Sequence, residues 1–277
     1  MSKPRQIIKI LIPVIVIAIL SACVSTETQN PNEPAMQEYS PPSLKEQGES
    51  GHWISRPTEG NLVIIGVSGN MSSNRLVISN ALDDAAAKVS MYNGITVTYE
   101  NRQNQATNFF DYENFTKITI DYDTELEHYK ERLKYDPEKD VIDAINAHFI
   151  RCTYPASFSG NLQYQIGKNS NGSPRWTTNP PNEIGGYLVG VGYAGRQSTL
   201  AKTITASCQS AAAALVIRKS SSLETYDLDA VSQNKNTSTN KNTATQKSSG
   251  KLTGFLVLET WIDKDSRVWT LAIAQKD

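Results

Sequence analysis

One order of motifs occurs twice in this chain, and it restricts the folds that the chain can adopt. A W-x-x-x-P motif, an apolar segment, a G-x-x-G motif and an alanine-rich stretch follow one another over residues 53–89 and again over residues 176–215. Gly192 follows Gly66 by 126 positions, and the same interval separates the two alanine-rich stretches. An internal duplication is the simplest account of this order, so we predict two copies of one structural unit.

Within each copy, the hydrophobic periodicity predicts a strand followed by a helix. Segments 94–101 and 117–123 alternate apolar and polar residues, as half-buried strands do. We therefore predict an α+β fold of duplicated strand-helix-strand units, with helices packed on one face of an antiparallel sheet.

Three helical faces are predicted from apolar residues at i, i+3 and i+4 spacing. The face in the first copy consists of Val77, Ala81, Leu82, Ala85 and Val89. The face in the second copy consists of Ile204, Cys208, Ala211, Ala212 and Leu215. Between the copies, Asp136-Pro137 is predicted to start a third helix, whose face consists of Val141, Ala144, Ile145 and His148.

These patterns divide the chain into four parts. Residues 1–22 are predicted to be a signal peptide and residues 23–51 a disordered tether. Residues 52–175 form the first repeat unit, with a helical middle segment. Residues 176–277 form the second repeat unit, which a disordered loop at 232–250 interrupts.

The N-terminal sequence predicts export and a lipid anchor. Basic residues precede an apolar run at 10–20, which is too short to span a bilayer stably but suits a secretory signal. The run ends in Leu20-Ser-Ala-Cys23, which resembles the lipobox of bacterial lipoproteins, where the signal is cut before the cysteine and the cysteine receives lipid. Lipid on Cys23 holds a protein on a membrane without a spanning helix. No aspartate follows Cys23, which favours the outer membrane over inner-membrane retention.

Composition separates the tether from the folded part and argues against one class of partner. Residues 24–51 have few apolar side chains and cannot bury enough surface to form a core. The tract at 232–250 has a single alanine and no larger apolar side chain. The 277-residue chain has a formal net charge of -1, a pI of about 6.3 and no basic stripe, so we do not expect it to bind nucleic acid.

Residues 190–195 have the G-x-G-x-x-G spacing of a dinucleotide-binding turn. That turn binds a nucleotide where an acidic residue closes a second strand about 20 positions on, and none does so after Gly190. In the first copy Ile64 stands in place of the first glycine. We therefore expect no nucleotide and no cofactor, and assign the shared glycines to a strand-to-helix turn with positive φ or to close helix packing.

The sequence contains no recognisable catalytic or metal-binding constellation. The acidic residues of segment 121–127 have calcium-loop spacing, but Leu126 stands where such a loop needs glycine. Asp263 and Asp265 are predicted to form a hairpin turn. Nucleophile-elbow, zinc-helix and P-loop motifs are absent from the sequence, so we predict neither an enzyme nor a metal site. The three histidines, none at ligand spacing with another, are His52, His128 and His148.

Two cysteines remain besides Cys23. An exported protein with two thiols can join them, and a bridge between Cys152 and Cys208 would tie the middle region to the second unit. Cys208 lies on the apolar face of a predicted helix, where a free thiol behaves as a small buried hydrophobe. Both alternatives stay open, and we favour two free buried thiols.

Three segments together resemble a known family. They are residues 53–69, residues 186–195 with the helix that follows, and residues 258–274, which resemble the family's terminal hairpin. The pattern resembles the Lpp-twenty family of small bacterial outer-membrane lipoproteins, which is named for a twenty-kilodalton antigenic lipoprotein and is related to some flagellum-associated lipoproteins. The resemblance implies a lipid-anchored protein of the cell envelope.

These observations leave three functional hypotheses. The favoured one is a non-enzymatic, lipid-anchored envelope lipoprotein with a structural or assembly role, whose partners are the membrane, through lipidated Cys23, and an unknown envelope protein. The alternative is a surface ligand-binding module or adhesin, for which an exposed apolar patch would be the mark. The third is an enzyme with an unfamiliar site, which would require a deep pocket with perturbed carboxylates.

Overall fold

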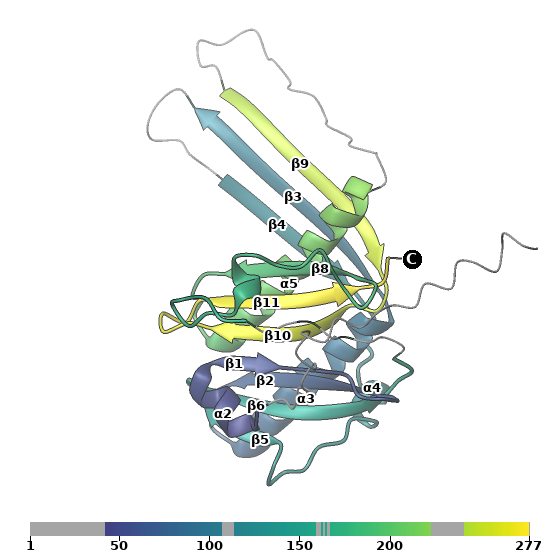
Figure 1. Ribbon diagram of the computed structural model, residues 1–277, viewed down its shortest axis with the longest axis vertical. Helices are drawn as coiled ribbons and strands as arrows, with labels where there is room; N and C mark the ends of the chain where they lie inside the picture. Colours follow the sequence, from purple (N-terminus) through teal and green to yellow (C-terminus); the bar gives the residue numbers. More distant parts are fainter. Residues whose placement is uncertain are drawn as a thin grey trace, which may run out of the picture. The chain divides into compact units, whose positions relative to one another are not determined.

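The predicted α+β fold is confirmed. The computed structural model describes residues 42–106, 114–158, 162, 164, 167–222 and 241–276 (Figure 1). These residues belong to one compact unit, Pro41–Asp277. The predicted signal peptide at 1–22 and the predicted lipidation site Cys23 lie outside the described residues.

Helices and strands alternate along the described chain (Figure 1). The helices are α2 (Leu44–Ser50), α3 (Asn74–Asn93), α4 (Glu127–Lys130) and α5 (Leu200–Ser222), with a 3-10 turn η1 (Arg175–Thr177). The strands of the first half are β1 (His52–Ile54), β2 (Asn61–Gly69), β3 (Ile95–Ala106), β4 (Asn114–Asp121), β5 (Val141–Ala144) and β6 (Ala147–Pro155). The strands of the second half are β7 (Glu183–Ile184), β8 (Tyr187–Ala194), β9 (Lys241–Leu252), β10 (Leu256–Ile262) and β11 (Val268–Ala274).

The described strands form three antiparallel sheets in place of the single sheet that we predicted. Sheet A has the order β1-β10-β11-β8-β7, sheet B has β2-β6-β5, and sheet C has β4-β3-β9. In sheet B, β2 is followed by α3 and pairs with the second strand of the hairpin β5–β6. In sheet A, β8 is followed by α5 and pairs with the second strand of the hairpin β10–β11. The strands that follow the two helices, β3 and β9, pair with each other.

The glycines shared by the two copies mark close packing of helix on strand. Gly66 and Gly192 lie inside β2 and β8 and do not have positive φ, so the predicted strand-to-helix turn is wrong at both. A Cβ added at Gly66 would lie 2.0 Å from the carbonyl oxygen of Ala81, and one added at Gly192 would lie 2.0 Å from that of Ser207. The two glycines are 126 positions apart, and so are the helix residues that they contact, Ala81 and Ser207. The close packing that we predicted as the other explanation accounts for both glycines; duplication of the sequence stays a prediction.

Side chains of α3 cover the edge of β2 that faces away from β6. The carboxylate of Asp84 accepts a hydrogen bond of 2.8 Å from the backbone N–H of Val67. The ammonium of Lys88 donates to the carbonyl of Ile65 at 2.6 Å and to Asp84 at 2.8 Å. Burial, the largest influence, would lower the pKa of Lys88, but Asp84, together with the nearby Cys208 and Cys152, outweighs burial and the pKa is raised. The pair satisfies backbone groups that another strand would otherwise bind.

Side chains of α5 likewise form hydrogen bonds with backbone groups at the edge of β8. The hydroxyl of Ser210 accepts from the N–H of Tyr193 at 3.4 Å, and the guanidinium of Arg218 donates to the carbonyl of Val189 at 2.8 Å. Tyr193 and Ser210 each follow their counterparts in the first contact, Val67 and Asp84, by 126 positions. Polar side chains of α3 and α5 thus occupy backbone hydrogen-bonding groups at the edges of β2 and β8.

Helix α5 lies between sheets A and C. It contacts β8 and β11 on one side and β9 on the other. A Cβ at Gly250 in β9 would lie 3.1 Å from a methyl carbon of Val216 of α5, which is closer than ordinary van der Waals contact. By length and composition alone, Leu200–Ser220 could cross a membrane, but much of it is core in this fold.

The predicted helix after Asp136-Pro137 is wrong, because this segment forms the hairpin β5–β6. Val141 and Ala144 lie in β5 and His148 lies in β6, paired with Asp143 by register and by a side-chain hydrogen bond. Ile145, with Asn146, makes the turn at positive φ, 53° and 60°. Apolar spacing fitted a helix as well as a strand, and the turn lacks the glycine that normally marks it.

The predicted tether extends too far toward the folded part. Residues 44–50 form α2, which begins at a capping box in which Ser43 and Glu46 bond each other's backbone N–H groups. The helix ends at Gly51 in the left-handed conformation, φ 64°. It packs on β5, where a Cβ at Gly48 would lie 3.1 Å from the Cβ of Ala144.

The predicted disordered loop at 232–250 is also wrong over its last ten residues. Residues 241–250 belong to β9 and pair with β3 as far as Ala106, opposite Lys241. The strand has almost no apolar side chains, so pairing with β3 defines it and hydrophobic alternation does not. Residues 232–240 lie outside the described residues.

Candidate functional site

A buried carboxylate in the C-terminal hairpin is hydrogen-bonded to three side chains that lie far from it in the sequence. Glu259 of β10 is 0% exposed. Its Oε2 lies 2.6 Å from Nε2 of His52 and accepts a 2.6 Å hydrogen bond from the indole N–H of Trp176. Its Oε1 accepts a hydrogen bond from the hydroxyl of Tyr164. We call these four residues the Glu259 cluster.

Strand register places Glu259 beside the N-terminal strand. Ile54 of β1 lies opposite Glu259, and His52 lies opposite Trp261. A β-bulge between Val257 and Glu259 shifts the pairing of β10 with β11. Bulges re-aim side chains, and this one precedes the residue on which the cluster depends.

The environment keeps Tyr164 a neutral donor. Burial raises the pKa of Tyr164 well above its ordinary value, and the nearby Glu259 carboxylate raises it further. The guanidinium carbon of Arg56 lies 4.7 Å from the centroid of the Tyr164 ring, within cation–π range. Both oxygens of Glu259 have hydrogen-bond partners, so the cluster holds β1 and the segment before β7 to β10.

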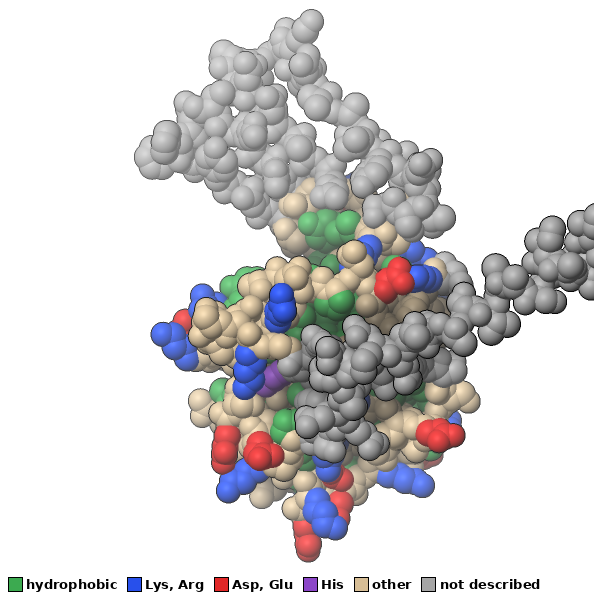
Figure 2. Space-filling model, in the orientation of Figure 1, with side chains coloured by type: hydrophobic (Ala, Val, Ile, Leu, Met, Phe, Trp, Pro, Cys, Tyr) green, Lys and Arg blue, Asp and Glu red, His purple; other side chains and the backbone are tan. Residues whose placement is uncertain are grey.

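Next to the cluster, three aromatic side chains form a row across sheet A. Tyr193 lies opposite Trp269, and Trp269 lies opposite Trp261. Their ring centroids are 4.9 Å and 4.8 Å apart, with the rings tilted. Tyr193 is 49% exposed, and Arg267 lies 5.9 Å from the Trp269 ring. On the face that Figure 2 shows, charges of both signs are interspersed with small apolar areas.

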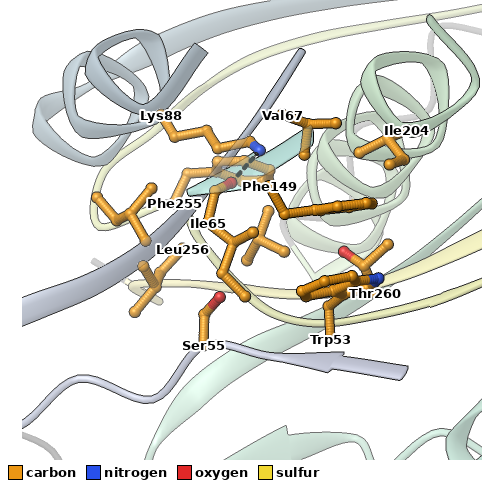
Figure 3. A pocket seen from close by; sticks show the side chains of 12 residues that line it. Trp53, Ser55, Ile65, Val67, Lys88, Phe149, Ile204, Phe255, Leu256 and Thr260 are labelled. Carbon is orange, nitrogen blue, oxygen red and sulfur yellow. Dashed lines mark hydrogen bonds between the residues drawn. The ribbon is translucent and has the colours of Figure 1, made fainter. Parts of the chain in front are cut away.

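A small cavity lies where strands β1, β2, β6 and β10 approach α3 and α5 (Figure 3). Trp53 and Phe149 stack at 3.8 Å on one side of it, and Lys88 bonds the Ile65 carbonyl on another. Its volume of about 20 Å³ suits a single water molecule. The indole N–H of Trp53 is buried and has no hydrogen-bond partner among the residues that the structure describes. Among the described residues, no carboxylate lines this cavity.

The acidic residues singled out in the sequence lie in loops and turns or at the ends of elements, since Asp121 ends β4 and Glu127 begins α4. Asp263 accepts hydrogen bonds from the backbone N–H groups of Asp265 and Arg267, and Ser266 has φ 61°, which confirms the predicted hairpin turn. Asp123 accepts from the N–H of Glu125 at 2.9 Å. Over the described residues, no group of three or more acidic, histidine or cysteine side chains could hold a metal.

Cys152 and Cys208 are both free and buried, as we favoured. Burial raises the pKa of Cys152 to about 12 and also raises the pKa of Cys208. Neither thiol is therefore ionised near neutral pH, and both behave as small core side chains.

Sequence reasoning did not find the Glu259 cluster. His52 and Glu259 are separated by 207 positions, and neither belongs to a local motif. One signal was present: the hairpin strand at 256–262 is apolar except for Glu259 and Thr260, and a carboxylate in such a strand must find donors.

Searches with family models, of curated proteins and of solved structures found no match to this chain.

Proposed function

We propose that this chain is a non-enzymatic, lipid-anchored protein of the cell envelope, held in the outer membrane by Cys23, with a structural or assembly role. The observation that carries the proposal is the apolar run that ends at Leu20-Ser-Ala-Cys23. Its likeness to the Lpp-twenty family rests on residues 53–69, 186–195 and 258–274.

The fold of the first described residues supports a mechanical role for the anchor. The segment after the tether enters the folded unit through α2 and β1. There His52 meets the buried Glu259, and Trp53 stacks on Phe149. A pull on the lipid would therefore be carried by sheet A and sheet B, not by a loosely attached terminus.

The arrangement of Glu259 supports the non-enzymatic part of the proposal. A general acid or base must reach a substrate proton. Glu259 is 0% exposed and has donors on both oxygens. Its contacts suit cohesion of the body better than proton transfer.

Replacement of Cys23 by Ser tests the anchor. We expect the variant to lose lipid and to move from the membrane fraction to the soluble fraction, because the polar tether has no affinity for a bilayer. Affinity capture from intact envelopes, with Cys23→Ser as the control, then tests the assembly role. One envelope protein recovered repeatedly with the lipidated form supports that role, whereas no reproducible partner contradicts it.

The aromatic row favours a second candidate, a surface ligand-binding module. Tyr193 is a large side chain that is 49% exposed and is continuous with Trp269 and Trp261. If this face binds a ligand, Tyr193→Ala should reduce binding of the purified protein to isolated envelopes without changing its thermal stability. Unchanged binding would remove this candidate.

A further inference from the structure

Edge strands can pair with other chains, and nearly every sheet edge in the described part of this fold is protected. In sheet A, the edge strands β1 and β7 are only three and two residues long. In sheet B, α3 covers β2 through Asp84 and Lys88, and α2 packs against the four-residue β5. Sheet C is different, because its edges β4 and β9 are eight and twelve residues long and each pairs only with β3 among the described strands.

The two edges of sheet C differ in charge. Strand β9 carries Lys241, Lys247 and Lys251 and no acidic residue, so two copies of it would bring only like charges together. Lysines on an edge strand are a common protection against pairing. Strand β4 instead carries one cation, Lys117, and one anion, Asp121.

The sequence of β4 is complementary to itself. In an antiparallel pair centred on Thr119, Lys117 lies opposite Asp121 of the second copy, and Ile118 lies opposite Ile120 of that copy. Opposite charges and β-branched pairs at directly opposed positions stabilise a sheet. A shift of one residue would set isoleucines opposite threonines and turn the two copies to opposite faces.

The exposure of β4 fits this pairing. Thr119, Lys117 and Asp121 are exposed, on the face away from α5. Ile118 and Ile120 pack at the margin of the core that α5 forms with sheet C and are only partly buried. A second β4 would extend that apolar surface and cover them.

We infer that β4 is a docking edge for a second copy of this chain, and that two copies pair antiparallel through Lys117–Asp121 about a twofold axis at Thr119. The result is a six-stranded sheet with α5 of both copies on one face. A twofold axis is the commonest symmetry of protein dimers, and antiparallel pairs are the commoner strand pairing. The inference does not depend on lipidation.

Cysteine cross-linking tests the axis directly. The parent is the full chain in detergent with Cys23→Ser, in which the other two thiols are buried. Thr119→Cys should give a disulfide-linked dimer on mild oxidation, because directly opposed Cα atoms of an antiparallel pair lie about 4.5–5.5 Å apart, within the range that a disulfide spans. Thr98→Cys and Ser249→Cys are matched controls: both residues are exposed and hydrogen-bonded to each other, on β3 and on the other edge, and neither should cross-link.

Charge exchange tests the register in the Thr119→Cys background. Asp121→Lys should lower the yield of dimer about tenfold, because it places two lysine pairs in opposition. Lys117→Asp combined with Asp121→Lys should restore the yield, since the opposite charges then meet again. Thermal unfolding of each variant shows that sheet C is intact. The inference is overturned if Thr119→Cys cross-links no more than Thr98→Cys, or if Ser249→Cys gives the dimer. It is also overturned if neither charge change alters the yield of dimer.

Discussion

At Glu259, three donor side chains share one buried carboxylate: one comes from β1, and two come from the segment between β6 and β7. Glu259→Ala would leave the donors on His52, Tyr164 and Trp176, which are buried or partly buried, without their acceptor. A buried hydrogen-bonding group that is left without its partner costs about 1–3 kcal/mol. We expect a decrease of that size in the free energy of unfolding, measured by urea denaturation.

Glu183→Ala is the matched control, because Glu183 forms an exposed ion pair with Lys276 at 2.5 Å. Exposed pairs contribute about 0–1 kcal/mol. A Glu259→Ala variant that is as stable as Glu183→Ala would show that the cluster does not hold β1 and the segment before β7 to the hairpin.

The buried thiol of Cys152 makes the protein sensitive to alkali. Burial raises its pKa from 9.0 to about 12, with the nearby Asp140 acting in the same direction. The unfolded chain therefore loses this proton at lower pH than the folded chain, so stability is full below pH 9 and falls as the pH rises toward 12. One pKa unit corresponds to about 1.4 kcal/mol, which gives a loss of about 4 kcal/mol over that window.

Urea denaturation at a series of pH values checks this, with Cys152→Ala for comparison. The substitution lowers stability at pH 7 by opening a small cavity, but it should flatten the decline above pH 9. Equal slopes for the two proteins would contradict the assignment. Part of the slope will persist, because the pKa values of Cys208 and Tyr164 are also raised by burial.

Strand β2 offers a matched test of helix packing. Gly66→Ala should destabilise the fold by about 1–3 kcal/mol or more, because the new methyl group would meet the backbone of α3. Gly69→Ala, three residues along the same strand, meets nothing within 4 Å and should change stability by less than about 0.5 kcal/mol.

Gly192→Ala in β8 should lower the stability of the fold as much as Gly66→Ala does, since the contact of the new methyl group with Ser207 is equally close. Thermal unfolding of the three variants checks both expectations. If Gly192→Ala is as stable as the wild type and abolishes saturable nucleotide binding, the packing role assigned to this glycine is wrong.

Elements with strong local signals were predictable from the sequence. The strand and helix at 61–93, their counterparts at 187–222 and the hairpin at 256–274 were anticipated from apolar spacing, glycine and turn residues. The hairpin β5–β6 was missed because Ile145 and Asn146 carry no glycine signal for their turn. Strand β9 was missed because only its pairing with β3 makes it a strand.

The candidate site was less predictable than the fold. A cluster such as that of Glu259 joins residues from β1, from the segment before β7 and from β10, and only the folded topology brings them together. By contrast, the turn at Asp263 was predictable, since all of its hydrogen bonds are local.

In the whole molecule, the proposed lipid anchor is connected to the folded body through α2 and β1. The sequence before α2 predicts lipid on Cys23. The contacts of His52 with Glu259 and of Trp53 with Phe149 fix the first strand to sheets A and B. Lipid on one residue and a firmly held first strand together suit a protein that keeps its body at a membrane surface.

Mass spectrometry of the protein extracted from membranes tests the proposed lipid anchor on Cys23. We expect the mature chain to begin at Cys23, with the preceding 22 residues removed and with acyl chains on this residue. A membrane-bound chain that retains the apolar run at 10–20, or that carries an unmodified Cys23, would contradict it.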